Sequence, residues 1–186
     1  ILTGALAADR GELVFGGAPV PERQRPFAYM PQRDVLLPWR SILDNAGIGL
    51  EVAGVPRAEA RRRVGELLVP FGLAGTERLY PRQLSGGMRQ RVSFLRTVVQ
   101  HRPVLLLDEP FGALDARVRK ELRQGLREIH DATGLTTIFV THDQDEAMEL
   151  ADLVVVMSMG RIEQIGRPQD IRARPATPFV REFITA

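Results

Sequence analysis

The 186-residue sequence contains no cysteine and a single lysine, Lys120, so its other basic residues are all arginines. Without cysteine, disulfide bonds and thiolate metal sites are excluded for these residues, which suits a reducing compartment without proving one. No apolar run reaches the roughly 18 residues that a membrane-spanning helix needs. The first residues do not show the pattern of a secretory leader.

The residues that are present have the composition of a globular domain, with 44% hydrophobic and 26% charged residues. The length suits one domain or slightly more, which is enough for a core. The formal charge is +2 and the isoelectric point about 9.6, and the arginines are densest at Arg61, Arg62 and Arg63. Apolar residues recur at helical spacing across residues 56–71, so we expect these arginines on a solvated helix face rather than against nucleic acid or lipid.

The first half of the chain is predicted to be mostly helical after a short start of strands. Residues 1–8 have the pattern of the last turns of a helix, and residues 12–16 and 27–30 have the pattern of strands separated by a Gly/Pro-rich turn. A loop over residues 31–38 carries Gln32. Residues 40–99 are predicted to be helical, with breaks near residues 54–56 and between residues 72 and 84.

The second half alternates between short apolar strands and helices. Strands are predicted at residues 104–107, 136–140 and 153–157, and helices at residues 114–133 and 144–150. Such alternation is typical of a parallel sheet covered by helices, which binds ligands at the carboxyl ends of its strands. The tail from residue 161 is predicted to hold a strand, a turn at Gly166-Arg-Pro168 and two short helices.

The segment Leu84-Ser-Gly-Gly-Met-Arg-Gln-Arg91 has the pattern of an anion-binding helix start. The Ser85 hydroxyl can cap the helix, while Gly86 and Gly87 let a ligand approach backbone amides at the positive end of the helix dipole. Many Ser-Gly-Gly turns simply begin helices, so this pattern alone leaves both interpretations open.

Asp108 and Glu109 follow four apolar residues, so a buried strand delivers two carboxylates to the sheet edge. One can hold Mg²⁺ beside phosphates, and the other can orient or deprotonate an attacking water. His142 ends the next predicted strand, where a neutral imidazole can bond to a phosphate or to that water. Gln32 follows another strand and offers a neutral amide. Each residue alone also fits an ordinary strand end.

Together these motifs resemble the ABC ATPases. Gln32, Leu84-Ser-Gly-Gly-Met88, Val104-Leu-Leu-Leu-Asp-Glu-Pro110, Gly112-Ala-Leu-Asp115 and His142 stand in the order and approximate spacing of that family's motifs. The resemblance implies an α/β fold with a P-loop NTPase-like parallel sheet core and a helical subdomain insertion. It implies one ABC ATPase domain over residues 1–186, divided into a core remnant (1–38), a helical subdomain (39–99), an α/β core (100–160) and a tail (161–186).

The resemblance also implies a role for each motif residue. Gln32 would be the Q-loop glutamine and would be catalytic together with Glu109 and the switch residue His142, and Asp108 would bind Mg²⁺ with Gln32. Asp115 would lie in the D-loop at a dimer interface. The residues implied to contact the ATP of the opposite subunit are Gln83, Ser85, Gly86 and Gly87.

The implied activity is that of an importer motor. Two ATP-binding subunits would close on two Mg-ATP molecules at the cytoplasmic face of the inner membrane. This closure would drive a membrane permease that receives its solute from an extracytoplasmic binding protein. No nucleic acid would be involved. Leu36-Leu-Pro-Trp-Arg40 resembles importers of the nitrate, sulfonate and taurine type. Trp39 would lie where the permease docks, or pack in a local core. The alternatives are a non-catalytic subunit and a soluble ABC ATPase acting on nucleic acid or ribosomes.

One family motif, the phosphate-binding G-x-x-x-x-G-K-[ST], does not occur in these 186 residues. We expect it a few residues upstream of Ile1, in a protein of which this sequence is a part. The isolated 186-residue chain is therefore expected to bind Mg-ATP poorly, since the main phosphate ligands are missing. Isothermal titration of this chain measures that affinity, and a micromolar dissociation constant would contradict the expectation.

Overall fold

The computed structural model describes residues 2–3, 9–21, 26–112 and 116–185. The chain forms two compact units, Ile1–Val140 and Thr141–Ala186, and each is described by itself. Most of the predicted helix over residues 1–8 lies outside the described residues. In the described part of the chain, no helix has both the length and the apolar character needed to cross a membrane.

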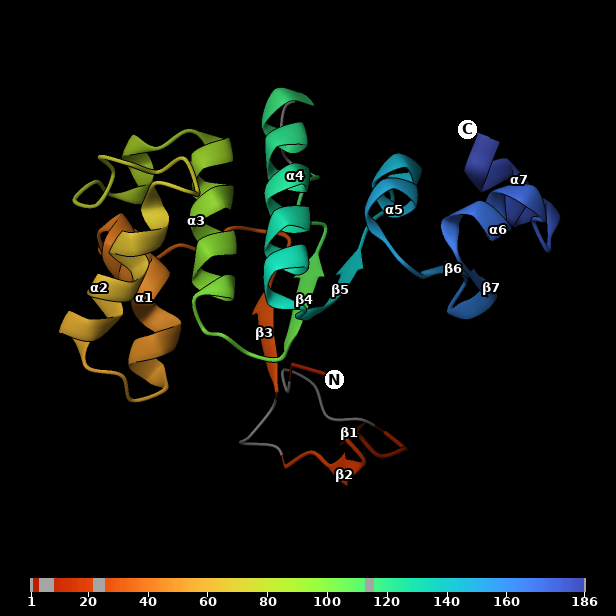
Figure 1. Ribbon diagram of the computed structural model, residues 1–186, viewed down its shortest axis with the longest axis horizontal. Coiled ribbons are helices and arrows are strands. Elements are labelled where there is room, and N and C mark those ends of the chain that lie inside the picture. Colours follow the sequence, from red (N-terminus) through yellow and green to blue (C-terminus); the bar gives the residue numbers. More distant parts are fainter. Residues whose placement is uncertain (1, 4–8, 22–25, 113–115, 186) are drawn as a thin grey trace. The chain divides into compact units, whose positions relative to one another are not determined.

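A parallel three-stranded sheet is the centre of the first unit (Figure 1). Its order is β3 (Phe27–Met30), β4 (Val104–Asp108) and β5 (Thr136–Val140). The central strand β4 is buried along Val104–Leu107, as expected of a strand covered on both faces. Because the three strands run in register, with Met30 opposite Leu107 and Leu107 opposite Phe139, their carboxyl ends meet at one edge.

The two faces of this sheet differ in how well they are covered. On one face Met30 and Leu107 meet apolar side chains of the α3 (Gly86–Val98) and α4 (Ala116–Thr133) helices, namely Phe94, Leu122 and Leu126. On the other face the side chains of Tyr29, Ile138 and Val140 are 42%, 47% and 58% exposed. Helix α4 connects β4 to β5, which makes the crossover that parallel strands require.

A helical layer separates β3 from β4 in the sequence. It consists of α1 (Ile42–Val52), α2 (Arg57–Leu68), the 3₁₀ turn η1 (Pro81–Gln83) and α3, and α3 packs against both α1 and β3 (Figure 1). These helices share one buried apolar cluster, which includes Ile42, Leu50, Val64, Leu68 and Leu95. The predicted helical region and its two breaks are therefore confirmed.

The predicted strand over residues 12–16 is shorter in the structure and belongs to a hairpin. Strand β1 (Val14–Phe15) pairs antiparallel with β2 (Ala18–Pro19) through Gly16 and Gly17. Both glycines have positive φ, 59° and 80°, as a two-residue type I′ turn requires.

The second unit holds α5 (Gln144–Leu150), β6 (Val154–Ser158), β7 (Arg161–Gly166), α6 (Pro168–Ala173) and α7 (Pro178–Thr185). The strand predicted over residues 153–157 is β6, which pairs antiparallel with β7 in a two-stranded sheet. Its place in the parallel sheet stays a prediction. A two-residue turn joins β6 and β7, with φ of 47° at Met159 and 75° at Gly160. Such a turn reverses the chain and makes the pairing antiparallel. The strand, turn and two helices of the tail are confirmed.

Candidate functional site

The carboxyl edge of the parallel sheet brings Gln32 and Glu109 together. Gln32 lies two residues beyond β3, and Glu109 is the first residue after β4. The Gln32 Nε2 donates a hydrogen bond to Glu109 Oε2 at 2.8 Å. This hydrogen bond from the amide fixes one oxygen of the Glu109 carboxylate at the edge of the sheet.

Glu109 has an unusual backbone conformation that sets the direction of its side chain. Its φ is 45°, in the left-handed region that residues other than glycine seldom adopt. The backbone N–H of Glu109 donates to Val140 O at 2.9 Å, and its carbonyl accepts from Gly112 N at 3.2 Å. A Cβ on Gly112 would lie 3.3 Å from Glu109 Oε2, so this glycine gives the carboxylate its space.

Asp108 has a partner that the sequence analysis missed. The Tyr29 hydroxyl donates to Asp108 Oδ2 at 3.1 Å. Partial burial, followed by the hydrogen bond to Asp108 and its negative charge, raises the pKa of Tyr29, so the phenol keeps its proton at neutral pH. The alternation of side chains along a strand could have predicted this contact. Tyr29 in β3 lies opposite Leu106 in β4, and Asp108 is two residues beyond Leu106, so Tyr29 and Asp108 share one face of the sheet.

Ser85 begins helix α3, as the sequence predicts. Its Oγ accepts a hydrogen bond from the Met88 N–H at 3.2 Å, and this leaves the hydroxyl hydrogen able to donate to a ligand. Gly86 and Gly87 occupy the first turn, where backbone amides point outward along the helix axis. Gln83 lies in the preceding turn, where its Oε1 accepts from the Tyr80 N–H at 2.9 Å.

The two remaining predicted site residues are His142 and Asp115. His142 is exposed and follows β5 by two residues, at the start of the second unit. Its turn is held by Thr141, whose Oγ1 donates to Glu146 Oε2 at 2.6 Å, and by Asp143, whose Oδ1 accepts from the Glu146 N–H at 3.1 Å. Asp115 lies outside the described residues.

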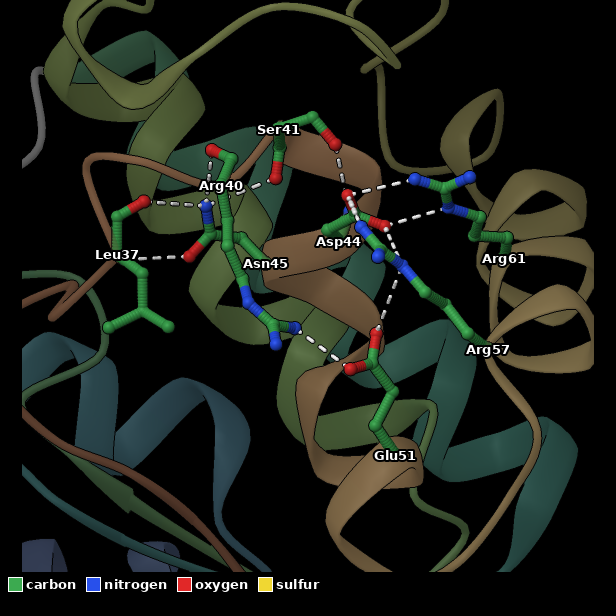
Figure 2. A network of polar contacts seen from close by, with 8 residues as sticks. All are labelled: Leu37, Arg40, Ser41, Asp44, Asn45, Glu51, Arg57 and Arg61. Carbon is green, nitrogen blue, oxygen red and sulfur yellow. Dashed lines mark hydrogen bonds and ion pairs between the residues drawn. The ribbon is translucent and has the colours of Figure 1, made fainter.

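The loop between Gln32 and α1 is held in place by one buried amide. The Asn45 side chain is fully buried, and its Oδ1 accepts from the Leu37 N–H at 2.7 Å. Its Nδ2 faces the carbonyl oxygens of Leu37, Arg40 and Ser41 at 3.0 to 3.1 Å (Figure 2). The fixed loop presents Trp39 with 72% of its surface exposed, which excludes the alternative that Trp39 packs in a local core.

Next to Asn45, a buried carboxylate ties α1 to α2. Asp44, whose side chain is 7% exposed, accepts from Arg57 Nη2 and Arg61 Nε, both at 2.7 Å (Figure 2). The hydrogen bond from Arg61 is the main cause that holds the pKa of Asp44 well below its usual range. The predicted solvated arginine face is confirmed for Arg62 and Arg63, which pair with Glu59 at the surface.

The Asp44 network has a pH dependence whose sign follows from the lowered pKa. A carboxyl with a depressed folded-state pKa stabilises the fold above its unfolded value of about 3.9 and loses that contribution as the pH falls further. Asp44→Asn is therefore expected to cost about 2 kcal/mol at pH 7, with a difference that shrinks below about pH 4. Urea unfolding of the parent protein and of the Asp44→Asn variant, at pH 7 and at pH 3, measures this difference in the free energy of unfolding.

Glu66→Gln is the matched control for Asp44→Asn. Glu66 pairs with Arg62 on the exposed face of α2, where an ion pair contributes at most about 0.5 kcal/mol. A destabilisation of Asp44→Asn that stays constant between pH 7 and pH 3 would contradict the role given to the charge.

Comparison with known proteins agrees with the resemblance seen in the motifs. The sequence profile of the ABC transporter family matches residues 1–112, which is more than half of the chain. The chain belongs to the ABC transporter family.

The relatives of this ABC chain include import proteins from several bacteria. It is 50% identical to the sulfate/thiosulfate import ATP-binding protein CysA 1 of Agrobacterium fabrum and 47% identical to CysA of Xylella fastidiosa. The matches cover 99% and 100% of this chain but 55% and 56% of those relatives, so the chain spans about half their length. The nitrate, sulfonate and taurine subtype is not confirmed by these names.

The ABC fold is also found by structural comparison. The chain superposes with a TM-score of 0.80 and 27% identity on cbiO1 from Clostridium perfringens, part of the ABC transporter complex cbiONQ, covering 94% of this chain and 73% of that one. The predicted α/β ABC ATPase fold is therefore confirmed, whereas the domain boundaries and the roles of individual site residues stay predictions.

Proposed function

We propose that the protein containing this chain is the ATP-hydrolysing subunit of an ABC importer. The observation that carries the proposal is the 2.8 Å hydrogen bond from Gln32 to Glu109, at a strand edge where Asp108 stands next in sequence. Its relatives named for sulfate and thiosulfate import support an inorganic sulfur oxyanion as the solute. This replaces the nitrate, sulfonate and taurine group as the preferred solute class.

In this proposal Glu109 orients the attacking water and accepts its proton. Gln32 holds the carboxylate by its amide, and Gly112 leaves room for it. Asp108 fits Mg²⁺, since this ion is bound by one or two carboxylates together with substrate phosphates. The ion would neutralise charge on the phosphates. Tyr29 donates to one oxygen of Asp108 and so orients the other for this task.

Helix α3 would act on the ATP of a second ATP-binding subunit. Ser85 supplies a hydroxyl donor, and Gly86 and Gly87 supply backbone amides at the positive end of the helix. Gln83 precedes them in the turn, and Asp115 and His142 keep the D-loop and switch roles that the family resemblance implies. Exposed Trp39 supports docking of a permease at the cytoplasmic face of the inner membrane, with a solute-binding protein on the other side.

The test uses the full-length protein assembled with its permease in proteoliposomes. We expect Mg²⁺-dependent ATP hydrolysis that rises when sulfate-loaded binding protein is added, together with uptake of radiolabelled sulfate. Taurine and nitrate serve as competing solutes. Hydrolysis without uptake of sulfate would contradict the assigned solute class, and no hydrolysis at all would contradict the proposed function.

A further inference from the structure

Helix α3 is tied to the loop that carries Gln32 by an ion pair. Arg89, in the first turns of α3, donates from Nε to Asp34 Oδ2 at 2.8 Å, and from Nη1 to Leu84 O at 3.0 Å. The second oxygen of Asp34 accepts from the Leu36 N–H at 3.4 Å. Arg89 and Asp34 are 37% and 30% exposed, so water screens this pair less than a surface pair.

A second arginine of α3 fastens the same loop through its backbone. Arg96 donates from Nη2 to Asp34 O at 2.8 Å and from Nη1 to Val35 O at 3.0 Å. Val35 has φ of 43°, which is costly for a β-branched residue and persists only where the surroundings enforce it. The two carbonyl oxygens converge on one guanidinium, which supplies that enforcement.

The same helix also reaches the chain on the far side of Glu109. Gln90 is 4% exposed, and its Nε2 donates to Pro110 O at 3.3 Å. Helix α3 therefore bonds to residues next to both members of the Gln32–Glu109 pair. These static contacts are the geometric basis for a coupling between the helix and the pair.

We propose that Asp34 and Arg89 are positioning residues that couple the Gln32–Glu109 pair to the N-terminus of α3. The inference rests on the proposed function, in which that N-terminus contacts the ATP of a second subunit. When Ser85 engages phosphate across the dimer, the ion pair and the Arg96 clamp carry the displacement to residues 32–35. Helix α3 of one subunit completes the ATP site of the partner. Through this coupling, the occupancy of that site affects the position of Glu109 in the subunit that supplies the helix.

The first experiment measures ATP-dependent dimerisation of the full-length protein in a Glu109→Gln background, by analytical ultracentrifugation. Asp34→Ala and Arg89→Ala are each expected to weaken the Mg-ATP dimer about tenfold and to leave the Mg-ATP affinity of the monomer unchanged. The double variant is expected to be no weaker than the worse single variant, since both remove one interaction. Unchanged dimerisation, or losses that multiply to about a hundredfold, would overturn the proposal.

The second experiment needs no ATP. In hydrogen exchange, Asp34→Ala is expected to speed exchange of amides in the first turns of α3, and Arg89→Ala that of residues 34–37. Asp131→Asn, which breaks the exposed Arg127–Asp131 pair on α4, should change neither region. Isosteric Asp34→Asn replaces Asp34→Ala if the latter fails to fold. If the parent protein does not dimerise with ATP, the proposed function is wrong. If hydrogen exchange is unaltered both in the first turns of α3 and in residues 34–37, the proposed coupling is wrong.

Discussion

Glu109→Gln is expected to lower the rate of ATP hydrolysis by the full-length protein about a hundredfold to ten-thousandfold, which is the usual contribution of a general base. The glutamine keeps an oxygen that can accept from Gln32 Nε2, so the fold and the loop should be unchanged. It has no basic group that can take a proton from water. Steady-state phosphate release, measured with saturating Mg-ATP, gives the rate.

The loss should appear in kcat rather than in nucleotide affinity. Binding of Mg-ATP to the Glu109→Gln variant is expected to match that of the parent, because Glu109 contributes to the reacting water and not to the phosphates. Glu66→Gln makes the same chemical change on the exposed face of α2 and should leave the rate unaltered. A Glu109→Gln variant with more than about a third of the parent rate would show that another group acts as the base.

Asn45→Asp is expected to destabilise the helical layer by about 3 kcal/mol at neutral pH, although the two side chains have the same shape. The Asn45 Nδ2 faces the carbonyl oxygens of Leu37, Arg40 and Ser41, and an aspartate would place a negative oxygen there instead of a donor. The site is fully buried, so water cannot relieve the repulsion. Denaturant unfolding and hydrogen exchange of residues 37–45 measure the effect.

The Asn45→Asp variant should recover part of its stability in acid, because a protonated carboxyl can donate to one of the three carbonyl oxygens. Gln164→Glu is the matched control. The Gln164 amide also bonds through both atoms, to Arg174 O and the Ala176 N–H, but it lies at the surface. Its replacement is expected to cost less than about 1 kcal/mol. Equal losses at positions 45 and 164 would show that burial does not set the penalty.

Local sequence patterns were sufficient to predict strands of the parallel sheet. The strands at residues 27–30 and 136–140 agree with β3 and β5, because short β-rich runs bounded by turn residues carry their own signal. The order of apolar strands and polar ends predicted that Gln32 and Glu109 each follow a strand, but it did not predict the hydrogen bond between them. The antiparallel pairing of β6 with β7 was not predicted, since the apolar run of β6 shows neither its partner nor the direction of the hairpin.

The contacts that orient the site could not be predicted in the same way. Asp34 meets Arg89 across 55 residues, and Asp44 meets Arg61 across 17. In a chain with many arginines, charge alone does not select the partner. The Tyr29–Asp108 bond and the convergence of two carbonyls on Arg96 depend on strand register and on the left-handed turn at Val35, which only the folded backbone defines.

The left-handed backbone conformation of Glu109 is a place where stability and the proposed activity favour different residues. Glycine or asparagine would adopt a φ of 45° with less strain than glutamate, yet neither offers a carboxylate to a water molecule. Selection for thermal stability alone would therefore replace the residue to which we assign the proton-accepting carboxylate. A stabilised library of this protein should be screened for turnover as well as for melting temperature, because its most robust members can be inactive at this position.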